Sequence, residues 1–456
     1  VTTPVAPTPV EVENLPVAPA GSGRKPQEAV AEAGVPAVPA VKPEVPAKPA
    51  IRAAQTESAA AQGSWRVPEV SRYPYIEDLE TSRARLSPLL LAAAKRLDEG
   101  WLLLDKDANG GGFCRDLWPS REQLIANNIR GNPHAVWGAW TGAAFDPVNH
   151  VMYFTGGGHR AYGGNEIYAL DLESLTCEIF TPQSALPTPD DPAHTPGEGQ
   201  GGAGCTFLWK DMAHNIPAVP GAGHTYDGIV YSPRTHSVFF MTGTHQCAGL
   251  GSRGGEEVWE LKLDSKEFVR HTPFANQSPD QPIRKNRFGT EVLPNGNLLF
   301  WGMHQAFEID PVSVTIVRQA PWSYVWIWEY ANTCGLASDG YVYRHREDAF
   351  ARINVAMGLG GEEWIGKEAH PTHWQSVGNY ASACVWDGRR FLMWNSARET
   401  ATFDPANRQF KRYFNEASEQ APSSRYPIDG SAGPISKMVW IEELDLFLGY
   451  DNPYEG

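Results

Sequence analysis

The stretch GAAFDPVNHVMYFTGGGH, residues 142–159, contains an apolar strand, a tight turn and a second, more hydrophobic strand. Its turn, DPVNH, has the Pro, Asn and Asp residues that β-hairpins use. The same plan returns in DGIVYSPRTHSVFFMTGTH, residues 227–245, and in TEVLPNGNLLFWGMH, residues 290–304. Three later copies are CGLASDGYVYRH (334–345), ACVWDGRRFLMWNSA (383–397) and KMVWIEELDLFLGYDN (437–452). A hairpin that recurs in this way predicts a repeat architecture.

Two more strands follow most of these hairpins. Third strands are visible as EIYALDLES, EVWELKLDS, AFEIDPVS and TATFDPANR, and fourth strands as TCEIF, EFVRHTP, TIVRQAP and QFKRY. Four short strands about every 40 to 55 residues are typical of propeller blades. The sequence therefore predicts an all-β propeller of six or seven four-stranded blades, because residues 183–222 form either a large loop or a degenerate blade.

The segment TGGGHRAYGGNEIYALDL, residues 155–172, resembles the kelch-repeat and galactose-oxidase-like propeller family. This resemblance extends over roughly two thirds of the chain and implies a fold, not an activity. Galactose-oxidase chemistry would need a copper site of two His and two Tyr, with a Cys joined to one Tyr. No local motif in the sequence matches that set.

Composition divides the chain into three predicted regions. Residues 1–64 are rich in Pro, Ala and Val and predict an extended or disordered arm. Residues 65–134 predict an amphipathic helix, at about 76–104, and a loop that pack on the propeller or close it. Residues 135–456 predict the kelch-like propeller itself.

Charge and cysteine content narrow the classes of partner and compartment. The formal net charge of -15 argues against nucleic acid and anionic membranes, and no apolar run is long enough to span a bilayer. The chain starts at Val1 rather than Met, which favours removal of an N-terminal segment and export. Cys334 and Cys384 lie in apolar strand-like runs and are predicted to be buried free thiols, whereas Cys205 and Cys247 lie in loops and are candidates for a disulfide.

Polar residues recur near the ends of the second strands. Alignment of those strands places four histidines just after them, at nearly equivalent points, with Asn395 and Asp451 at the corresponding points of later blades. The histidines are His159, His245, His304 and His345, and the polar neighbours are Arg160, Tyr162, His224, Tyr226, Arg344 and Arg346. Equivalent positions in a propeller lie at one height around its axis, so these residues predict a ligand-binding channel mouth. The alternative is that each residue caps a turn of its own blade.

The loop DKDANGGGFCRD, residues 105–116, has the spacing of a calcium-binding loop. Asp105, Asp107, Asn109 and Asp116 would be the ligands. Two departures weaken this reading, since Asp116 lacks the reach of the usual Glu and Gly112 replaces an apolar residue. The alternative is an Asp/Gly-rich turn, and nothing else in the sequence requires a cofactor.

Together these features predict a non-enzymatic binding or structural protein that is exported or particle-associated, at a virion or a cell surface. It would recognise a glycan or protein through the channel mouth, with residues 1–64 as a tether to a larger assembly. The second hypothesis is a carbohydrate-active enzyme of the polysaccharide lyase type. It would pair a His or Tyr base with an Arg that neutralises a substrate carboxylate.

Overall fold

The structure is a computed structural model, and the residues that it describes all belong to the second of two compact units, Gly63–Gly456. The described residues are 78–97, 102, 104, 113–114, 117–127, 129, 133, 135–138, 141–156, 164–184, 220, 225, 227–241, 258–271, 273, 289–301, 305–321, 332–346, 349–355, 362–365, 382–395, 400–413 and 437–450. They form five four-stranded antiparallel sheets and one two-stranded sheet.

In each sheet the strands pair in the order of the sequence. The first three sheets are β1 (Ala143–Asp146), β2 (Val151–Phe154), β3 (Ile167–Asp171), β4 (Thr176–Thr181); β5 (Ile229–Ser232), β6 (Ser237–Phe240), β7 (Val258–Lys262), β8 (Glu267–His271); and β9 (Gly289–Val292), β10 (Leu298–Trp301), β11 (Gln305–Asp310), β12 (Thr315–Pro321). The last three are β13 (Asn332–Leu336), β14 (Tyr341–Arg346), β15 (Ala349–Asn354), β16 (Glu362–Ile365); β17 (Ser382–Trp386), β18 (Phe391–Asn395), β19 (Thr400–Asp404), β20 (Gln409–Tyr413); and β21 (Met438–Ile441), β22 (Leu446–Gly449).

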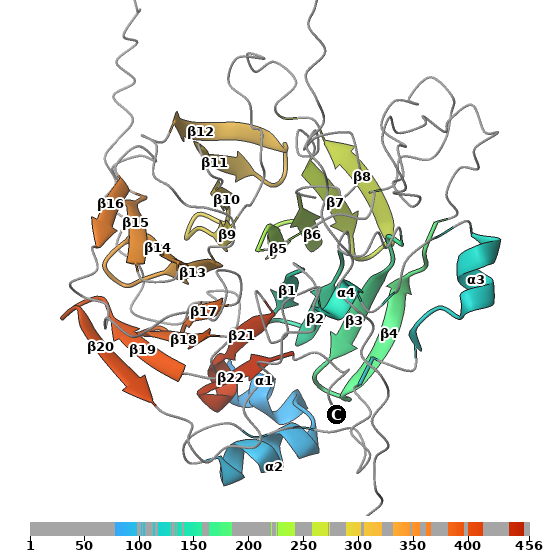
Figure 1. The fold of residues 1–456 in the computed structure, drawn as a ribbon, viewed down its shortest axis with the longest axis horizontal. Helices are drawn as coiled ribbons and strands as arrows, with labels where there is room; N and C mark the ends of the chain where they lie inside the picture. Colours follow the sequence, from blue (N-terminus) through green and yellow to red (C-terminus); the bar gives the residue numbers. More distant parts are fainter. Residues whose placement is uncertain are drawn as a thin grey trace, which may run out of the picture. The chain divides into compact units, whose positions relative to one another are not determined.

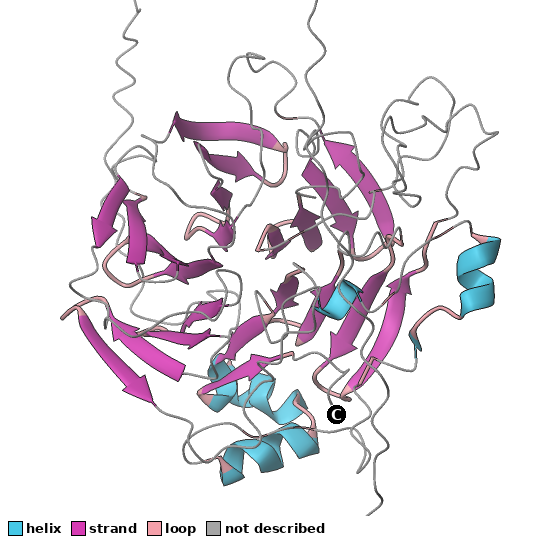
Figure 2. Cartoon of the chain, viewed as in Figure 1, coloured by secondary structure: helices cyan, strands magenta, loops and turns pink. Residues whose placement is uncertain are grey.

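The six sheets follow one another around a ring. The first strand of each sheet contacts the first strand of the next, from β1 through β5, β9, β13 and β17 to β21. Figure 1 shows these first strands toward the middle of the ring and the last strands outside, and Figure 2 shows that strands dominate the fold. The chain is therefore a β-propeller, as the repeats predicted.

A separate buried apolar cluster fills each of the six junctions between neighbouring sheets. Strand geometry explains this, because successive side chains point to opposite faces of a sheet. In β2, for example, Met152 and Phe154 pack toward the sixth sheet, whereas Tyr153 packs toward the second. The strongly hydrophobic second strands of the repeat are therefore buried on both faces.

The predicted number of four-stranded blades, six or seven, is wrong. Among the described residues five sheets have four strands, and the sixth contains only β21 and β22. Helices α1 (Leu79–Arg85) and α2 (Pro88–Arg96) lie on the outer side of this two-stranded sheet in Figure 1. Leu86 and Leu90 share a buried cluster with Val439 and Ile441 of β21, so helical side chains cover apolar surface that strands cover elsewhere.

The single helix predicted for residues 76–104 is likewise two helices. The first ends at Arg85, and the Ser87 side chain accepts a hydrogen bond from the backbone N–H of Leu89 at the start of the second. Pro88 occupies the first turn of α2, where its missing N–H costs little, but in the middle of one long helix it would interrupt the hydrogen bonding. Ser87 and Pro88 together therefore set a boundary that the apolar periodicity hides.

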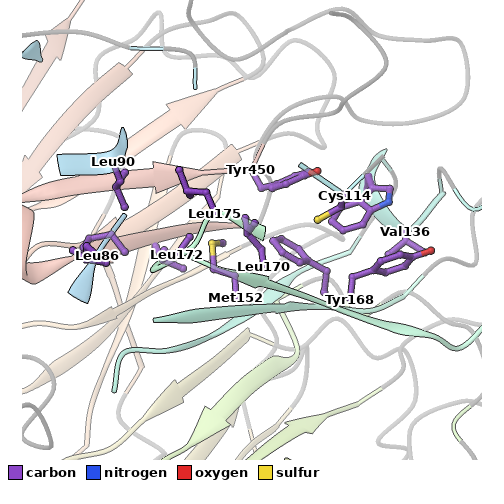
Figure 3. Packing of buried hydrophobic residues seen from close by; sticks show 14 of the residues in the cluster. Leu86, Leu90, Cys114, Val136, Met152, Tyr168, Leu170, Leu172, Leu175 and Tyr450 are labelled. Carbon is purple, nitrogen blue, oxygen red and sulfur yellow. The ribbon is translucent and has the colours of Figure 1, made fainter. Parts of the chain in front are cut away.

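Two more short helices precede the first sheet, α3 (Arg121–Ala126) and α4 (Ala135–Gly138), and the turn η5 (Glu442–Leu444) joins β21 to β22. Figure 3 shows the cluster in which Leu86, directly after α1, and Leu90 of α2 meet Met152, Leu170 and Tyr450. A disulfide between Cys114 and Cys177 of β4 attaches the segment before the propeller to the outer strand of the first blade. The described residues between Asp78 and Pro133 thus include several that pack on the ring, among them Leu86, Leu90 and Cys114, while the predicted domain boundaries remain predictions.

Cys334 and Cys384 are buried, as predicted, but they are not free thiols. They form a disulfide that joins β13 to β17, the first strands of the fourth and fifth blades. The pairing of β13 with β14 shifts register between Thr333 and Gly335, and Cys334 lies at that irregularity. Two cysteines fifty residues apart in sequence are neighbours here because the ring places successive first strands side by side. Cys205 and Cys247 lie outside the described residues.

Candidate functional site

The predicted channel mouth corresponds to the end of the ring where the first strands begin. The last residue of β2, Phe154, pairs with Ala143 at the start of β1, and Phe240 and Trp301 pair with the starts of β5 and β9. A side chain that follows a second strand is thus attached at the same end of the ring in each blade. The described residues therefore show where the second strands end, but they do not show the predicted site itself.

Most of the predicted ligand-binding residues lie outside the described residues, and their role stays a prediction. These are His159, Arg160, Tyr162, His224, Tyr226, His245, His304 and Asp451. The backbone of Asn395 is described, but its side chain is not. The predicted calcium ligands Asp105, Asp107, Asn109 and Asp116 also lie outside, so the proposal of calcium in that loop rests on sequence alone.

The histidines are not all at one point of the repeat. His345 lies inside β14, paired with Asn332 and Phe350, and Asn395 lies inside β18, paired with Ser382. The sequence placed both just after their strands. His345 and Asn395 fall within their strands because β14 and β18 each continue further along the chain than β2 and β6.

Arg344 lies inside the protein rather than at an open mouth. Its side chain is 2% exposed, and its Nη1 donates a hydrogen bond to the backbone oxygen of Trp301, 3.1 Å away, in the neighbouring blade. The guanidinium carbon also lies 5.6 Å from the centre of the Trp301 ring. A buried Arg needs hydrogen bonds to offset the loss of water, and here a carbonyl of the third blade provides one. Arg344 therefore joins the third and fourth blades.

His345 is fully buried on the opposite face of the same strand. Its ring centre lies 4.9 Å from that of Phe350, which in turn stacks on Phe403 of the fifth blade at 4.4 Å. This aromatic packing belongs to the junction between the fourth and fifth blades. Neither Arg344 nor His345 presents its side chain to solvent.

The same kind of contact joins other blades at this end of the ring. Thr225, before β5, donates from Oγ1 to the backbone oxygen of Thr155 in the first blade at 3.1 Å. Thr290 of β9 donates to the backbone oxygen of Asp227 at 2.8 Å. Lys437, before β21, donates from Nζ to the backbone oxygen of Thr141 at 3.0 Å. In each pair a side chain of one blade binds a backbone carbonyl of its neighbour.

We call Thr225, Thr290, Arg344 and Lys437 the junction donors. The sequence pattern did not indicate a role for Thr225, Thr290 or Lys437, and it predicted that Arg344 binds a ligand. Their position in the repeat could have indicated this role. Thr225 and Lys437 each come a few residues before a first strand, and Thr290 lies near the start of one. Their chemistry differs from blade to blade, so a comparison of repeats does not bring them out.

A Ser–His–Glu arrangement lies at the opposite end of the ring. Ser82 Oγ lies 2.9 Å from His150 Nε2, and His150 Nδ1 lies 3.1 Å from a carboxylate oxygen of Glu173. These distances are those of a hydrolytic triad. However, Ser82 Oγ donates a hydrogen bond to Glu443 Oε1 at 2.5 Å, and Ser82 and His150 are 4% and 0% exposed. A buried hydroxyl held by a carboxylate cannot receive a substrate carbonyl, so the cluster is structural in this state.

No group of three or more His, Cys, Asp or Glu side chains with metal-binding geometry occurs within the described part of the chain. In that same part, no helix is long and apolar enough to cross a bilayer.

Comparison with known proteins yields no family for this chain. No family model matches it, and no curated protein does. Similar solved structures include PorZ, a surface component of the type-IX secretion system of Porphyromonas gingivalis, with 8% identity over 65% of this chain and 29% of that chain and a TM-score of 0.34. The WD40 repeats of RRP9 match with 7% identity over 43% of this chain and 52% of that chain, with a TM-score of 0.30.

A protein of unknown function from Bacteroides caccae matches with 11% identity over 42% of this chain and 62% of that chain, with a TM-score of 0.27. The chain thus spans less than two thirds of each of these structures. Likeness at this level carries no information about what the chain binds or does. The propeller assignment rests on the sheet order and the six junctions described above.

Proposed function

We propose that this protein is a non-enzymatic propeller that works outside the cell or on a particle and binds a glycan or a protein through the loops at the mouth. Residues 1–64 serve as the tether to a larger assembly. A rigid ring that presents variable loops at one end is a common arrangement for a binding module.

The observation that carries this proposal over the lyase alternative is the burial of Arg344 and His345. A lyase needs a cation at the substrate carboxylate and a base at the proton to be removed. Arg344 and His345 are candidates for those roles by residue type, yet Arg344 binds a backbone oxygen and His345 packs on Phe350. Both side chains thus contribute to blade packing, so a lyase would have to take its cation and its base from other residues.

The two disulfides found among the described residues support an oxidising compartment. Cys114–Cys177 attaches the segment before the ring to the first blade, and Cys334–Cys384 joins two blades. Disulfides of this structural kind form and persist mainly in exported proteins. They support the part of the proposal that places the protein at an extracellular surface or on a particle.

Glycan-array and protein pull-down experiments with His245→Ala and His304→Ala test the binding proposal. Both variants should lose the ligand with an unchanged melting temperature. His236→Ala is the matched control, since His236 lies in the β5–β6 turn at the other end of the same blade and pairs with Asp264. Equal loss of binding in all three variants would contradict recognition at the mouth.

A second experiment separates binding from catalysis. The purified protein is incubated with a panel of uronic-acid polysaccharides, and absorbance of the unsaturated product is followed. We expect no product from any polymer. Product formation that disappears in His245→Ala would replace the binding proposal with the lyase hypothesis.

A further inference from the structure

Three segments that are far apart in the sequence meet in one buried polar cluster where the ring closes. Glu443 Oε1 of η5 lies 2.9 Å from His150 Nε2 in the first blade, and it accepts a hydrogen bond from Ser82 Oγ of α1 at 2.5 Å. His150 Nδ1 lies 3.1 Å from Glu173 Oε1, which also binds Arg85 of α1 at 2.8 Å. We call these five residues the closure cluster.

The geometry of the closure cluster favours opposite charges on neighbouring groups. Both ring nitrogens of His150 face carboxylate oxygens, and a carboxylate only accepts hydrogen bonds. A ring that donates from both nitrogens, which is the imidazolium form, satisfies both carboxylates at once. Along the cluster Glu443, His150, Glu173 and Arg85 then alternate in sign, and the formal charges cancel. Of these groups His150 and Glu443 are buried, at 0% and 2% side-chain exposure, and a buried ion pair is strongly destabilised when one partner loses its charge.

The closure cluster also lies where the last sheet meets the first blade. His150 and Glu173 come from the first blade, Glu443 comes from the last sheet, and Ser82 and Arg85 come from helix α1. Two further hydrogen bonds reach backbone oxygens of the first blade. The backbone N–H of Ser87 donates to the oxygen of Leu172, and the Arg85 side chain donates from Nη2 to the oxygen of Val148. The last sheet has two strands among the described residues, so helical and polar contacts take a larger share of closure here than at the other junctions.

We propose that the closure cluster is an acid-sensitive latch, and that protonation of Glu443 releases α1 and the two-stranded sheet from the first blade. With Glu443 neutral, His150 faces one carboxylate rather than two, and the Ser82 hydroxyl loses its charged acceptor. The predicted consequence is local opening at one junction while the other five stay closed. This proposal does not depend on what the mouth binds.

The electrostatics of Glu443 give the direction of the effect. Burial by itself would raise the pKa of Glu443, but the hydrogen bonds from His150 and Ser82 outweigh it and hold the pKa below the ordinary value of 4.5. A carboxyl group with a lowered folded-state pKa stabilises the folded state fully above its unfolded pKa. That stabilisation is lost as the pH falls through the folded value. The latch is thus closed at neutral pH and opens in acid.

Other charged groups near the cluster belong to the same elements. Glu442 and Asp445 flank Glu443 in the η5 turn, and Arg83 lies on α1 with Arg85. Glu173 is half-buried at 31% side-chain exposure, whereas the side chain of Glu443 is 2% exposed. Water can therefore replace the lost interactions of a neutral Glu173 more easily than those of a neutral Glu443.

The second blade provides a matched control of the same chemistry. Ser237 Oγ donates to Glu260 at 2.8 Å, and His271 Nε2 lies 2.8 Å from the other oxygen of Glu260. Here too hydrogen bonds from His271 and Ser237 outweigh burial and lower the pKa of the glutamate. All three residues belong to one sheet, so this set does not hold the ring closed.

Hydrogen exchange measured by mass spectrometry on the full chain tests the latch. Rates are corrected for the intrinsic effect of pH and compared at neutral pH and at about pH 3.5. In acid, we expect α1, α2, β21 and β22 to exchange at least about tenfold faster, with β5 and β6 unchanged. Glu443→Gln should open the same segments at neutral pH and remove the acid step.

Glu260→Gln should raise exchange within the second blade and leave α1 and α2 as in the wild type. Uniform opening of all blades in acid, or equal opening of α1 by both substitutions, would overturn the proposal. If Glu443→Gln does not fold, Ser82→Ala keeps all charges and removes one hydrogen bond. This milder variant should open the same segments. The latch would also be overturned if the hydrogen-exchange rate of α1 stayed unchanged both in Ser82→Ala and in the wild type in acid.

Discussion

Lys437 Nζ donates a hydrogen bond to the backbone oxygen of Thr141 at 3.0 Å, across 296 positions of sequence. Both residues are buried, at 1% and 0% exposure. One precedes the last sheet and the other precedes the first, so this pair joins the two ends of the repeat array at the mouth. The closure cluster joins the same two sheets at the other end of the ring.

Lys437→Met should lower the free energy of unfolding by about 1–3 kcal/mol, because the carbonyl of Thr141 stays buried and loses this donor. Urea denaturation measures the change. Lys266→Met is the control, since Lys266 is half-exposed and its ion pair with Glu178 and its contact with Phe180 lie on the surface. The control should cost no more than about 1 kcal/mol. Equal costs would mean that Lys437 does not contribute to closure.

Arg344→Ala should destabilise the protein by roughly 3 kcal/mol, since it removes a buried hydrogen bond and leaves a void beside Trp301. Arg344→Lys should recover part of the loss, because an ammonium can still donate to the carbonyl but lacks the planar contact with the indole. Chemical denaturation of both variants gives the values. A variant with wild-type stability and lost ligand binding would instead restore Arg344 to the predicted binding site.

Replacement of both Cys334 and Cys384 by Ser should lower the unfolding free energy by about 2–4 kcal/mol, because the disulfide closes a loop of fifty residues in the unfolded chain. Thermal unfolding with and without a reductant measures this. The double variant should lose most of its sensitivity to the reductant, and what remains should come from Cys114–Cys177 among the disulfides described. Unchanged sensitivity would show that the Cys334–Cys384 bond does not stabilise the ring.

Four tyrosines should stay protonated in the folded protein at pH values where an exposed tyrosine ionises. Burial is the largest cause that raises the pKa of Tyr153, Tyr168, Tyr231 and Tyr343 above the ordinary value of 10.0. Stability that depends on their neutral form is complete below about pH 10 and falls as the pH rises further. The tyrosinate absorbance of these four residues should therefore appear only together with alkaline unfolding. A smooth titration of all tyrosines before unfolding would contradict this.

Deletion of residues 1–64 should leave the unfolding of the ring unchanged, because the chain divides into compact units at Gln62 and Gly63. Circular dichroism of the truncated protein tests folding. Co-sedimentation with cells or particles tests the tether and should decline. Attachment equal to that of the full chain would refute the tether, whereas loss of folding would show that the arm belongs to the ring.

Much of the fold could be predicted because the repeat is local. The turns DPVNH and SPRTH begin with residues whose side chains or backbones close a hairpin, and Asp146 accepts hydrogen bonds from the backbone of Val148 and Asn149. The last residues of these turns, His150 and His236, have φ of 55° and 48°. The hairpins β1–β2 and β5–β6 follow from these residues and from the apolar runs beside them.

The candidate site could be predicted only in part. The repeat placed the residues after second strands at one end of the ring, but it could not show that β14 and β18 extend through His345 and Asn395. Strand length depends on the partner strand, and β15 continues the pairing as far as Ala349. The same limitation hid the third and fourth strands of this blade, AFARIN and EEWI, whose sequences match the repeat poorly.

The sequence by itself determined that this chain is a propeller, because turn residues and alternating apolar residues act over a few positions. Only the tertiary structure decided the partners across the junctions: Arg344 with Trp301, Cys334 with Cys384, Lys437 with Thr141 and Glu443 with His150. Each pair is separated by tens to hundreds of residues. Their contacts exist because the ring brings successive blades, and finally the last and the first sheets, side by side.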